Sequence, residues 1–341
     1  MGPTTRKPIA LALQGGGAHG AYTAGALDRL LEDGELAVEA LSGASAGAVS
    51  AVAVAIGLAR GGPPEAQRLL RAVWDRVSRL GALTLSVCPP FASVFAAISA
   101  VASPYQYNPI GLNPLRSILQ DLDYKVLLAG NAPTVHVAAT HVESGRARVF
   151  GNADLARHGM DVLLASACLP RAFHAVEIDG EHYWDGGYAA NPSLMDLVRA
   201  DAGDVVLLRL TPALRAGVPR TAEDISARLG EIQVDSALLS EIRVLAALGM
   251  PDRRLRLHTL DGGIDLGLLS PRSKLIATPA LIHKLWQSGC AAADRWLPRH
   301  MAQIGQRSTC LEYRRARDEL RQLQPSAGAF CFEHRAVAAP P

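Results

Sequence analysis

The stretch LALQGGGAHGAYTAG, residues 11–25, decides the fold, because a short apolar run ends there in three consecutive glycines. Residues 7–13 have the length and apolar content of a buried strand. Residues 21–33 carry apolar side chains at helical spacing, with Gly34 as the expected C-cap. A buried strand that leads through a glycine turn into a helix is typical of a parallel α/β sheet.

A second unit of the same kind follows directly. Residues 38–42 predict a strand and residues 46–58 a helix, and the stretch SGASAGAVSA at residues 42–51 joins them. In parallel neighbouring strands, the two strand-to-helix turns lie at the same edge of the sheet. We therefore expect an α/β fold of three layers, α/β/α, with a mainly parallel central sheet.

The rest of the chain continues this pattern without an internal repeat or a clear linker. An Asp179-Gly180 pair predicts a tight hairpin turn. Further strands are expected at residues 134–142, 146–152, 204–210 and, half exposed, 254–260; helices are expected at 65–80, 114–122, 161–168 and 225–248 and in most of the chain from there to 323.

Composition limits the classes of function. The 341 residues are 49% hydrophobic, enough to bury a large core, and the net charge of +2 gives no general attraction to nucleic acid. Five scattered cysteines indicate free thiols in a reducing compartment. The apolar run at residues 9–13 is too short for the core of a signal peptide. The sequence therefore predicts a cytoplasmic protein without bound nucleic acid.

An uncharged segment at residues 80–115 interrupts the pattern of charges, but several prolines cut it. Its longest clean helical stretch, residues 91–102, is too short to cross a bilayer. This segment fits either core packing or a lid that touches lipid, which would bring the protein to a membrane or lipid surface as a peripheral contact. We expect one domain at residues 7–300 with this insertion, and a helical extension with a loose tail at 301–341.

The candidate nucleophile is Ser45, in the pentapeptide Gly43-Ala44-Ser45-Ala46-Gly47. This G-x-S-x-G pattern between a strand and a helix predicts a sharp turn that exposes the serine hydroxyl, because Gly43 and Gly47 keep neighbouring Cβ atoms out of the way. The helix that begins at Ala46 points its positive end toward negative charge that develops during attack.

The glycine turn has two interpretations. Gly15-x-Gly17-x-x-Gly20 fits a dinucleotide-binding fingerprint, with Glu39 as the ribose-binding acid. The same free amides of Gly15, Gly16 and Gly17 also suit an oxyanion hole. The position of Glu39 favours the oxyanion hole, because the chain runs on from this residue into the serine turn rather than ending its strand there.

A serine nucleophile needs a base. Three late histidines, His258, His283 and His300, do not lie in a glycine-flanked turn after a strand. Asp185 does, because Gly186 and Gly187 follow a short predicted strand, and burial would raise its pKa toward that of a useful base. Asp261-Gly262-Gly263 repeats this tripeptide but lacks the Asn-Pro continuation, which makes it the weaker candidate.

Together, the glycine turn at residues 14–20, the elbow at 43–47 and the Asp-Gly-Gly motif at 185–187 resemble the patatin-like phospholipase family. The similarity extends over residues 8–297 and includes ASACLP at 165–170 and Asn-Pro at 191–192.

The resemblance implies a lipid acyl hydrolase with a dyad of Ser45 and Asp185, an oxyanion hole of Gly15, Gly16 and Gly17, and no metal or cofactor. Many members of the family carry Arg or Lys where this chain has His19. Two alternatives remain open: a thioesterase or soluble-ester carboxylesterase with the same dyad, and a nucleotide- or lipid-binding protein without catalysis.

Overall fold

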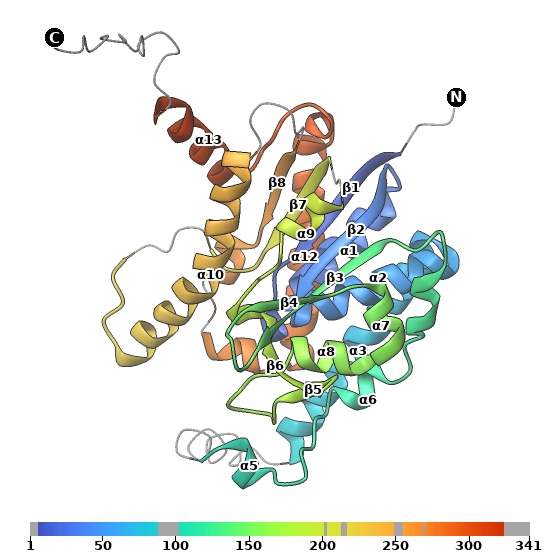
Figure 1. The fold of residues 1–341 in the computed structure, drawn as a ribbon, viewed down its shortest axis with the longest axis vertical. Coiled ribbons are helices and arrows are strands. Elements are labelled where there is room, and N and C mark those ends of the chain that lie inside the picture. Colours follow the sequence, from blue (N-terminus) through green and yellow to red (C-terminus); the bar gives the residue numbers. More distant parts are fainter. Residues whose placement is uncertain are drawn as a thin grey trace, which may run out of the picture.

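A computed structural model describes residues 6–87, 102–200, 203–212, 217–248, 255–267, 269 and 271–323. Across these residues the central sheet has eight strands in the order β5-β6-β3-β2-β1-β7-β8, and β4 pairs with β3 off this path (Figure 1). The strands are β1 (Lys7–Leu13), β2 (Leu36–Ala44), β3 (Thr134–His141), β4 (Ala147–Phe150), β5 (Val176–Ile178), β6 (Glu181–Asp185), β7 (Asp204–Arg209) and β8 (Arg256–Asp261).

The sheet is mainly parallel, as the sequence predicts. Strands β3, β2, β1, β7 and β8 run parallel to one another, while β4 and β6 pair with β3, and β5 with β6, in antiparallel fashion at one end. The β5–β6 hairpin turns at Asp179 and Gly180, which both have positive φ. The antiparallel end brings the terminus of β6 next to β3, and this pairing places Asp185 near the serine turn.

Helices cover both faces of this sheet. The longer ones are α1 (Gly20–Asp33), α2 (Ala46–Gly61), α3 (Pro63–Val87), α10 (Ala222–Leu248), α12 (Pro279–His300) and α13 (Leu311–Leu323). The shorter ones are α5 (Pro104–Tyr107), α6 (Arg116–Leu119), α7 (Asn152–His158), α8 (Met160–Ser166), α9 (Met195–Arg199) and α11 (Gly263–Gly267), with 3-10 turns η1 (Gly17–His19), η2 (Tyr124–Leu128), η3 (Gly186–Tyr188), η4 (Pro271–Leu275) and η5 (Met301–Gln303).

Alternating side chains of β1 separate two hydrophobic cores. Leu11 and Leu13 face a large core shared with α1, α2, α3 and α12. Ala10 and Ala12 face a smaller core that includes α9, α10 and α13. In Figure 1, α10 and α13 lie to the left of the sheet and α2, α3, α7 and α8 to its right. The two cores confirm the three-layer α/β/α arrangement, because β1, β2, β7 and β8 each contribute buried side chains to both of them.

Helix α2 is apolar on every side, and its residues from Gly47 to Gly57 are all buried. A helix of this kind belongs in the interior, where it packs against the sheet, α1 and α3. Residues 40–59 contain no charged side chain, and they form the end of β2, the turn at Ser45 and most of α2. Within the described part of the chain, no helix has both the length and the apolar content needed to span a membrane.

Three local expectations differ from the structure. The helix expected at 114–122 is a single turn, α6, and it ends where the Leu119 carbonyl accepts hydrogen bonds from the Leu122 amide and the Tyr124 hydroxyl. The helix expected at 161–168 begins one residue earlier as α8, after a break at Gly159, whose φ is 58°. Strand β8 is mostly buried rather than half exposed, because α12 and α13 cover its two faces.

The structure describes only part of the predicted insertion and of the predicted C-terminal extension. Residues 88–101 of the expected insertion lie outside the described residues, and so does the tail after residue 323. Helix α13, in the expected extension, packs against α10, and its Tyr313 is fully buried in the smaller core. The boundary near residue 300 therefore does not separate two hydrophobic cores.

Candidate active site

Ser45 lies at the junction of β2 and α2, with φ of 52° and ψ of −125°. Only two non-glycine residues in the described ranges have positive φ, Ser45 and the hairpin residue Asp179. This conformation is strained for a residue with a Cβ, and it turns the serine side chain out of the sharp bend. The amide of Ser45 donates a 2.9 Å hydrogen bond to Oγ of Ser166, a fully buried side chain at the end of α8.

The flanking glycines permit this turn through close backbone contacts. A Cβ at Gly43 would lie 2.6 Å from the Ala48 amide nitrogen, and one at Gly47 would lie 2.2 Å from the Leu13 carbonyl oxygen. These separations are shorter than a carbon atom tolerates against backbone. The strand β1, the strand β2 and the start of α2 therefore approach each other as only glycine allows.

Asp185 ends β6 and reaches Ser45 across one intervening strand. Ala44 pairs with Ala138 on β3, and the next β3 residue, Ala139, pairs with Asp185. Asp185 is 5% exposed, and the hydroxyl of Ser45 lies close enough to its carboxyl to lower the pKa of that group. The structure thus brings together two residues that are 140 positions apart in the sequence.

Backbone contacts fix the carboxylate. The Asp185 amide donates to the Cys168 carbonyl at 2.8 Å. The Gly187 amide donates to Oδ1 of Asp185, also at 2.8 Å. A Cβ at Gly186 would lie 2.1 Å from the Ala138 carbonyl oxygen, so this glycine lets the chain turn tightly over β3. Each residue of the Asp-Gly-Gly motif therefore has a separate geometric task.

Burial raises the pKa of Asp185 to about 6, against the opposing effect of hydrogen bonds from Gly187 and Ser45. A carboxylic acid with this pKa is a much better proton acceptor than an ordinary aspartate and is still ionised near neutral pH. The site therefore contains a hydroxyl close to a base of suitable strength.

The glycine turn lies beside the serine. A Cβ at Gly15 would approach Cβ of Ser45 to 2.9 Å. The Gly15 amide donates to Oδ1 of Asn191 at 2.6 Å, and the Asn191 side chain donates back to the Gly15 carbonyl at 3.4 Å. The three expected oxyanion donors are thus not equivalent, because the amide of Gly15 already has a partner.

The amides of Gly16 and Gly17 have no hydrogen-bond acceptor among the residues that the structure describes. Gly17 has φ of 57°, and a Cβ there would lie 2.2 Å from the Lys274 carbonyl oxygen. The first amides of α2, beginning with that of Ala46, also lack intrahelical partners, as in any helix. These donors share one edge of the sheet with Ser45 and suit a developing negative charge.

Three supporting residues had no role in the interpretation of the sequence, although the motifs quoted for the resemblance contain them. Asn191 holds the glycine turn, Ser166 holds the Ser45 amide, and fully buried Gln14 accepts hydrogen bonds from the amides of Leu210 and Thr211. Polar residues of these types are common throughout the sequence, and only the fold shows which distant amide each of the three contacts.

His19 lies in the glycine turn and is 2% exposed. Burial, with a smaller effect from Lys274, lowers the pKa of His19 to about 4. Its Nε2 is 2.7 Å from Oγ of Ser273, and its Nδ1 has no hydrogen-bond partner within the described residues. The imidazole is therefore neutral at pH 7 and does not replace the cation that the resemblance places at this position.

The alternative bases have other partners. His258 is fully buried between Asp204 and Thr309, and His300 contacts the same Thr309 hydroxyl. Asp261 caps its own turn through the Gly263 amide at 2.7 Å, at the end of β8. Strands β1 and β7 lie between β8 and β2, so Asp261 is farther along the sheet from Ser45 than Asp185 is.

Glu39, the residue that the dinucleotide interpretation requires, is an exposed residue inside β2. The strand continues for five more residues to Ala44 before the turn begins. A carboxylate at this point does not reach the edge of the sheet where the glycine turn lies. The geometry therefore gives no support to a nucleotide site at the glycine turn.

Exposed apolar side chains lie near Asp185. Tyr188, in the turn η3 that follows Asp185, is 45% exposed. Tyr105 stacks on His174 with ring centroids 4.1 Å apart, and Ile110 and Leu112 flank Gly111, where an added Cβ would lie 3.3 Å from Nδ1 of His174. His174 is linked to the site through Cys168, whose thiol donates to the His174 carbonyl and whose own carbonyl accepts from the Asp185 amide.

Comparisons with known proteins were made for sequence and fold. A sequence model described as patatin-like phospholipase matches residues 11–198, more than half of the chain. The search of curated proteins found no match. Among solved structures, VipD from Legionella pneumophila is similar, with 16% identity and a TM-score of 0.41 over 86% of this chain and 67% of that chain.

Proposed function

This chain belongs to the patatin-like phospholipase family, and on that premise we propose that it is a serine lipid acyl hydrolase with Ser45 as nucleophile and Asp185 as base. The family assigns it to the hydrolases that act on lipid esters. The observation that supports these particular residues is the proximity of the strained Ser45 to the buried carboxyl of Asp185, whose pKa the Ser45 hydroxyl lowers. Sequence family and local geometry support the same chemistry independently.

In the first step, Oγ of Ser45 attacks the carbonyl carbon of the ester while Asp185 takes the hydroxyl proton. The carbonyl π bond becomes an alkoxide, and a tetrahedral intermediate forms. The raised pKa of Asp185 supports this transfer, because the carboxylate is a stronger base than an ordinary aspartate and needs no histidine between it and the serine.

The alkoxide then needs hydrogen-bond donors fixed in advance. The amides of Gly16 and Gly17 and the first amide of α2, that of Ala46, are the candidates. Gly15 acts differently in this proposal: its amide binds Asn191 and holds the turn in place. Fixed donors of this kind cost little reorganisation when the charge appears.

The intermediate collapses when the bond from carbon to the leaving oxygen breaks. Asp185 returns its proton to that oxygen, and the alcohol departs. Water then attacks the acyl-serine ester with Asp185 again as base, and the fatty acid leaves as Ser45 regains its proton. Every step uses the same two side chains, and none requires a metal or a cofactor.

A long acyl chain is the substrate portion that the surroundings suit best. Tyr105, Ile110, Leu112 and Tyr188 are exposed apolar residues linked to the segment that positions Asp185. Apolar side chains next to a catalytic group bind an acyl chain and contact a lipid surface. We therefore propose peripheral contact with a lipid surface, and a cytoplasmic location remains a prediction from the sequence.

Two other functions fit parts of the site. A thioesterase or soluble-ester carboxylesterase would use the same dyad on a smaller or different acyl compound. A lipid- or nucleotide-binding protein would need no base beside Ser45, and the placement of Glu39 speaks against the nucleotide. The contact between Ser45 and Asp185 favours an enzyme over either form of binding protein.

Hydrolysis of a nitrophenyl ester by the S45A and D185N variants tests the dyad. We expect each variant to lose activity by at least about 1,000-fold, with an unchanged circular dichroism spectrum. D261N is the matched control, because Asp261 has the same Asp-Gly-Gly sequence and the same local turn but lies farther along the sheet from Ser45. Activity retained in S45A or D185N, or lost equally in D261N, contradicts the assignment.

A comparison of phospholipid micelles with monomeric esters of the same acyl chain separates the substrate classes. A rise in turnover above the critical micelle concentration supports a lipid surface as the substrate. Equal turnover on both, or a preference for the thioester analogue, supports the thioesterase or soluble-ester alternative instead.

A further inference from the structure

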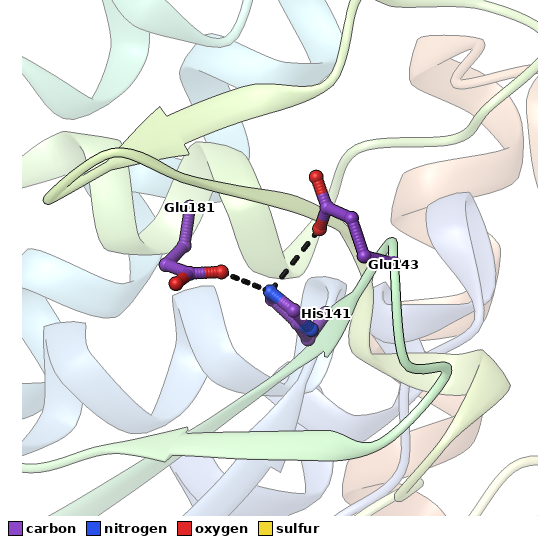
Figure 2. A group of neighbouring side chains, drawn as sticks. All are labelled: His141, Glu143 and Glu181. Carbon is purple, nitrogen blue, oxygen red and sulfur yellow. Dashed lines mark hydrogen bonds and ion pairs between the residues drawn. The ribbon is translucent and has the colours of Figure 1, made fainter.

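Three side chains with metal-binding atoms meet at the exposed end of β3, outside the proposed active site. His141 is the last residue of β3, Glu143 lies in the turn to β4, and Glu181 begins β6. Figure 2 shows the imidazole of His141 between the two carboxylates. One ligand atom from each residue lies within 4.8 Å of the others, close enough to surround one ion.

Two carboxylates of this cluster approach a single imidazole nitrogen. Oxygens of both Glu143 and Glu181 approach the same nitrogen, Nε2 of His141, the former at 3.1 Å. A ring nitrogen holds at most one proton, and a proton points in one direction. One N–H on Nε2 therefore points at only one of the two carboxylates, whereas a divalent cation would bind an oxygen of each and accept the lone pair of Nε2.

The remaining contacts orient the same groups. Nδ1 of His141 is 2.8 Å from Oγ of Ser144, which leaves Nε2 to face the carboxylates. Oε1 of Glu143 is 3.1 Å from Nδ1 of His182, while its other oxygen faces His141. Metal-binding imidazoles and carboxylates commonly have such partners on their second nitrogen or oxygen.

We propose that His141, Glu143 and Glu181 form a binding site for a divalent transition-metal ion, best suited to Zn²⁺. One nitrogen and two carboxylate oxygens match the donors that zinc takes, and water completes a tetrahedral set. The imidazole disfavours Ca²⁺ and Mg²⁺, which prefer oxygen ligands throughout. The half-exposed carboxylates leave the site open to ions from solvent.

The site connects β3 with β6, the strand that ends at the proposed base. β6 begins at Glu181 and ends at Asp185, and its residue Tyr183 pairs with His141 on β3. An ion held by Glu181 and His141 therefore joins the ends of these strands. Because it binds the folded chain and not the unfolded one, it raises the melting temperature as its concentration increases.

Isothermal titration of the full chain, free of any affinity tag, with Zn²⁺ tests the proposal. We expect one ion per chain, loss of measurable binding in H141A, and roughly a 10-fold weaker affinity in H182A, which removes the partner of Glu143. H158A is the matched control: His158 also pairs with a surface carboxylate, that of Asp179, and its loss leaves Zn²⁺ binding unchanged. The melting temperature of the parent chain, but not of H141A, rises with Zn²⁺.

Two results would overturn the proposal. One is an H141A variant that is folded by circular dichroism and binds Zn²⁺ as tightly as the parent chain. The other is a strong thiolate-to-cobalt charge-transfer band in the Co²⁺-loaded protein, which would assign the ion to a cysteine. These readouts are independent of ester hydrolysis, so they test the metal site whether or not the proposed function holds.

Discussion

The amide of Gly15 donates a 2.6 Å hydrogen bond to the side chain of Asn191, although 176 residues separate them. This contact ties the glycine turn after β1 to the segment that follows Asp185. Asn191 is 2% exposed, so no solvent replaces its side chain. The glycine turn, which lies beside the nucleophile and carries proposed oxyanion donors, is therefore held by a residue of the segment that follows the base.

Removal of this contact is expected to affect both stability and catalysis. N191A leaves the buried Gly15 amide without an acceptor, which costs about 1–3 kcal/mol of the free energy of unfolding. The glycine turn shifts, and we expect kcat to fall roughly 10- to 100-fold. Denaturant unfolding and ester hydrolysis measure the two effects. N152A is the control, because Asn152 accepts a similar hydrogen bond from the Val135 amide. Equal kcat losses in both variants would show that the effect is only one of stability.

The pH dependence of hydrolysis reports the base. Asp185 must be ionised to accept the serine proton, and its pKa is raised to about 6 by burial. We therefore expect kcat/KM to increase tenfold per pH unit below about pH 6 and to level off above it. His19, with a pKa of about 4, adds no inflection near pH 7. An inflection near 4 alone, the ordinary aspartate value, is incompatible with a buried base.

The same buried carboxylate reduces stability at neutral pH. The pKa of Asp185 is about 6 in the folded chain and 3.8 ordinarily, so the folded state holds its proton more tightly than the unfolded state. This tighter proton binding stabilises the folded state fully below about pH 4, and the stabilisation is lost as the pH rises through about 6. D185N should thus raise the free energy of unfolding at pH 8 by up to about 3 kcal/mol relative to its effect at pH 3. Urea unfolding at the two pH values measures this, and no difference between them argues against the raised pKa.

The elbow glycines are expected to be intolerant of a methyl group. In G47A the new Cβ meets the Leu13 carbonyl oxygen at 2.2 Å, so β1 and α2 must separate. We expect a loss of about 1–3 kcal/mol in the free energy of unfolding and little remaining hydrolysis. G130A is the control, since a Cβ there meets nothing within 4 Å. Thermal melting and ester hydrolysis compare the variants, and a stable, active G47A contradicts the close packing described here.

Much of the fold was predictable because its signals are local. The apolar runs of β1 and β7 and the helical spacing of α1 define buried elements without reference to the rest of the chain. The burial of β8 was not predictable, because it depends on α13, a helix that begins 50 residues after that strand ends. The short α6 also escaped prediction, since the carbonyl of its last residue, Leu119, accepts a hydrogen bond from Tyr124, which lies beyond the expected helix.

The candidate site was likewise predictable in part. Glycines next to Ser45 and Asp185 indicate a turn at each of these residues, and the structure places the two side chains close together. The separate role of Gly15 could not be read from three identical glycines, because it depends on Asn191 and on the pairing of β6 with β3. The neutral state of His19 likewise depends on burial by elements distant in the sequence, including the turn that carries Ser273.

The most direct test of the central claim is labelling of the full chain with a fluorophosphonate probe, followed by mass spectrometry of its peptides. A serine activated by a buried carboxylate reacts with this probe, whereas an ordinary serine does not. We predict one labelled residue, Ser45, with labelling abolished in S45A and strongly slowed in folded D185N. Absence of labelling, or labelling at another serine, would contradict the proposed nucleophile and with it the catalytic function.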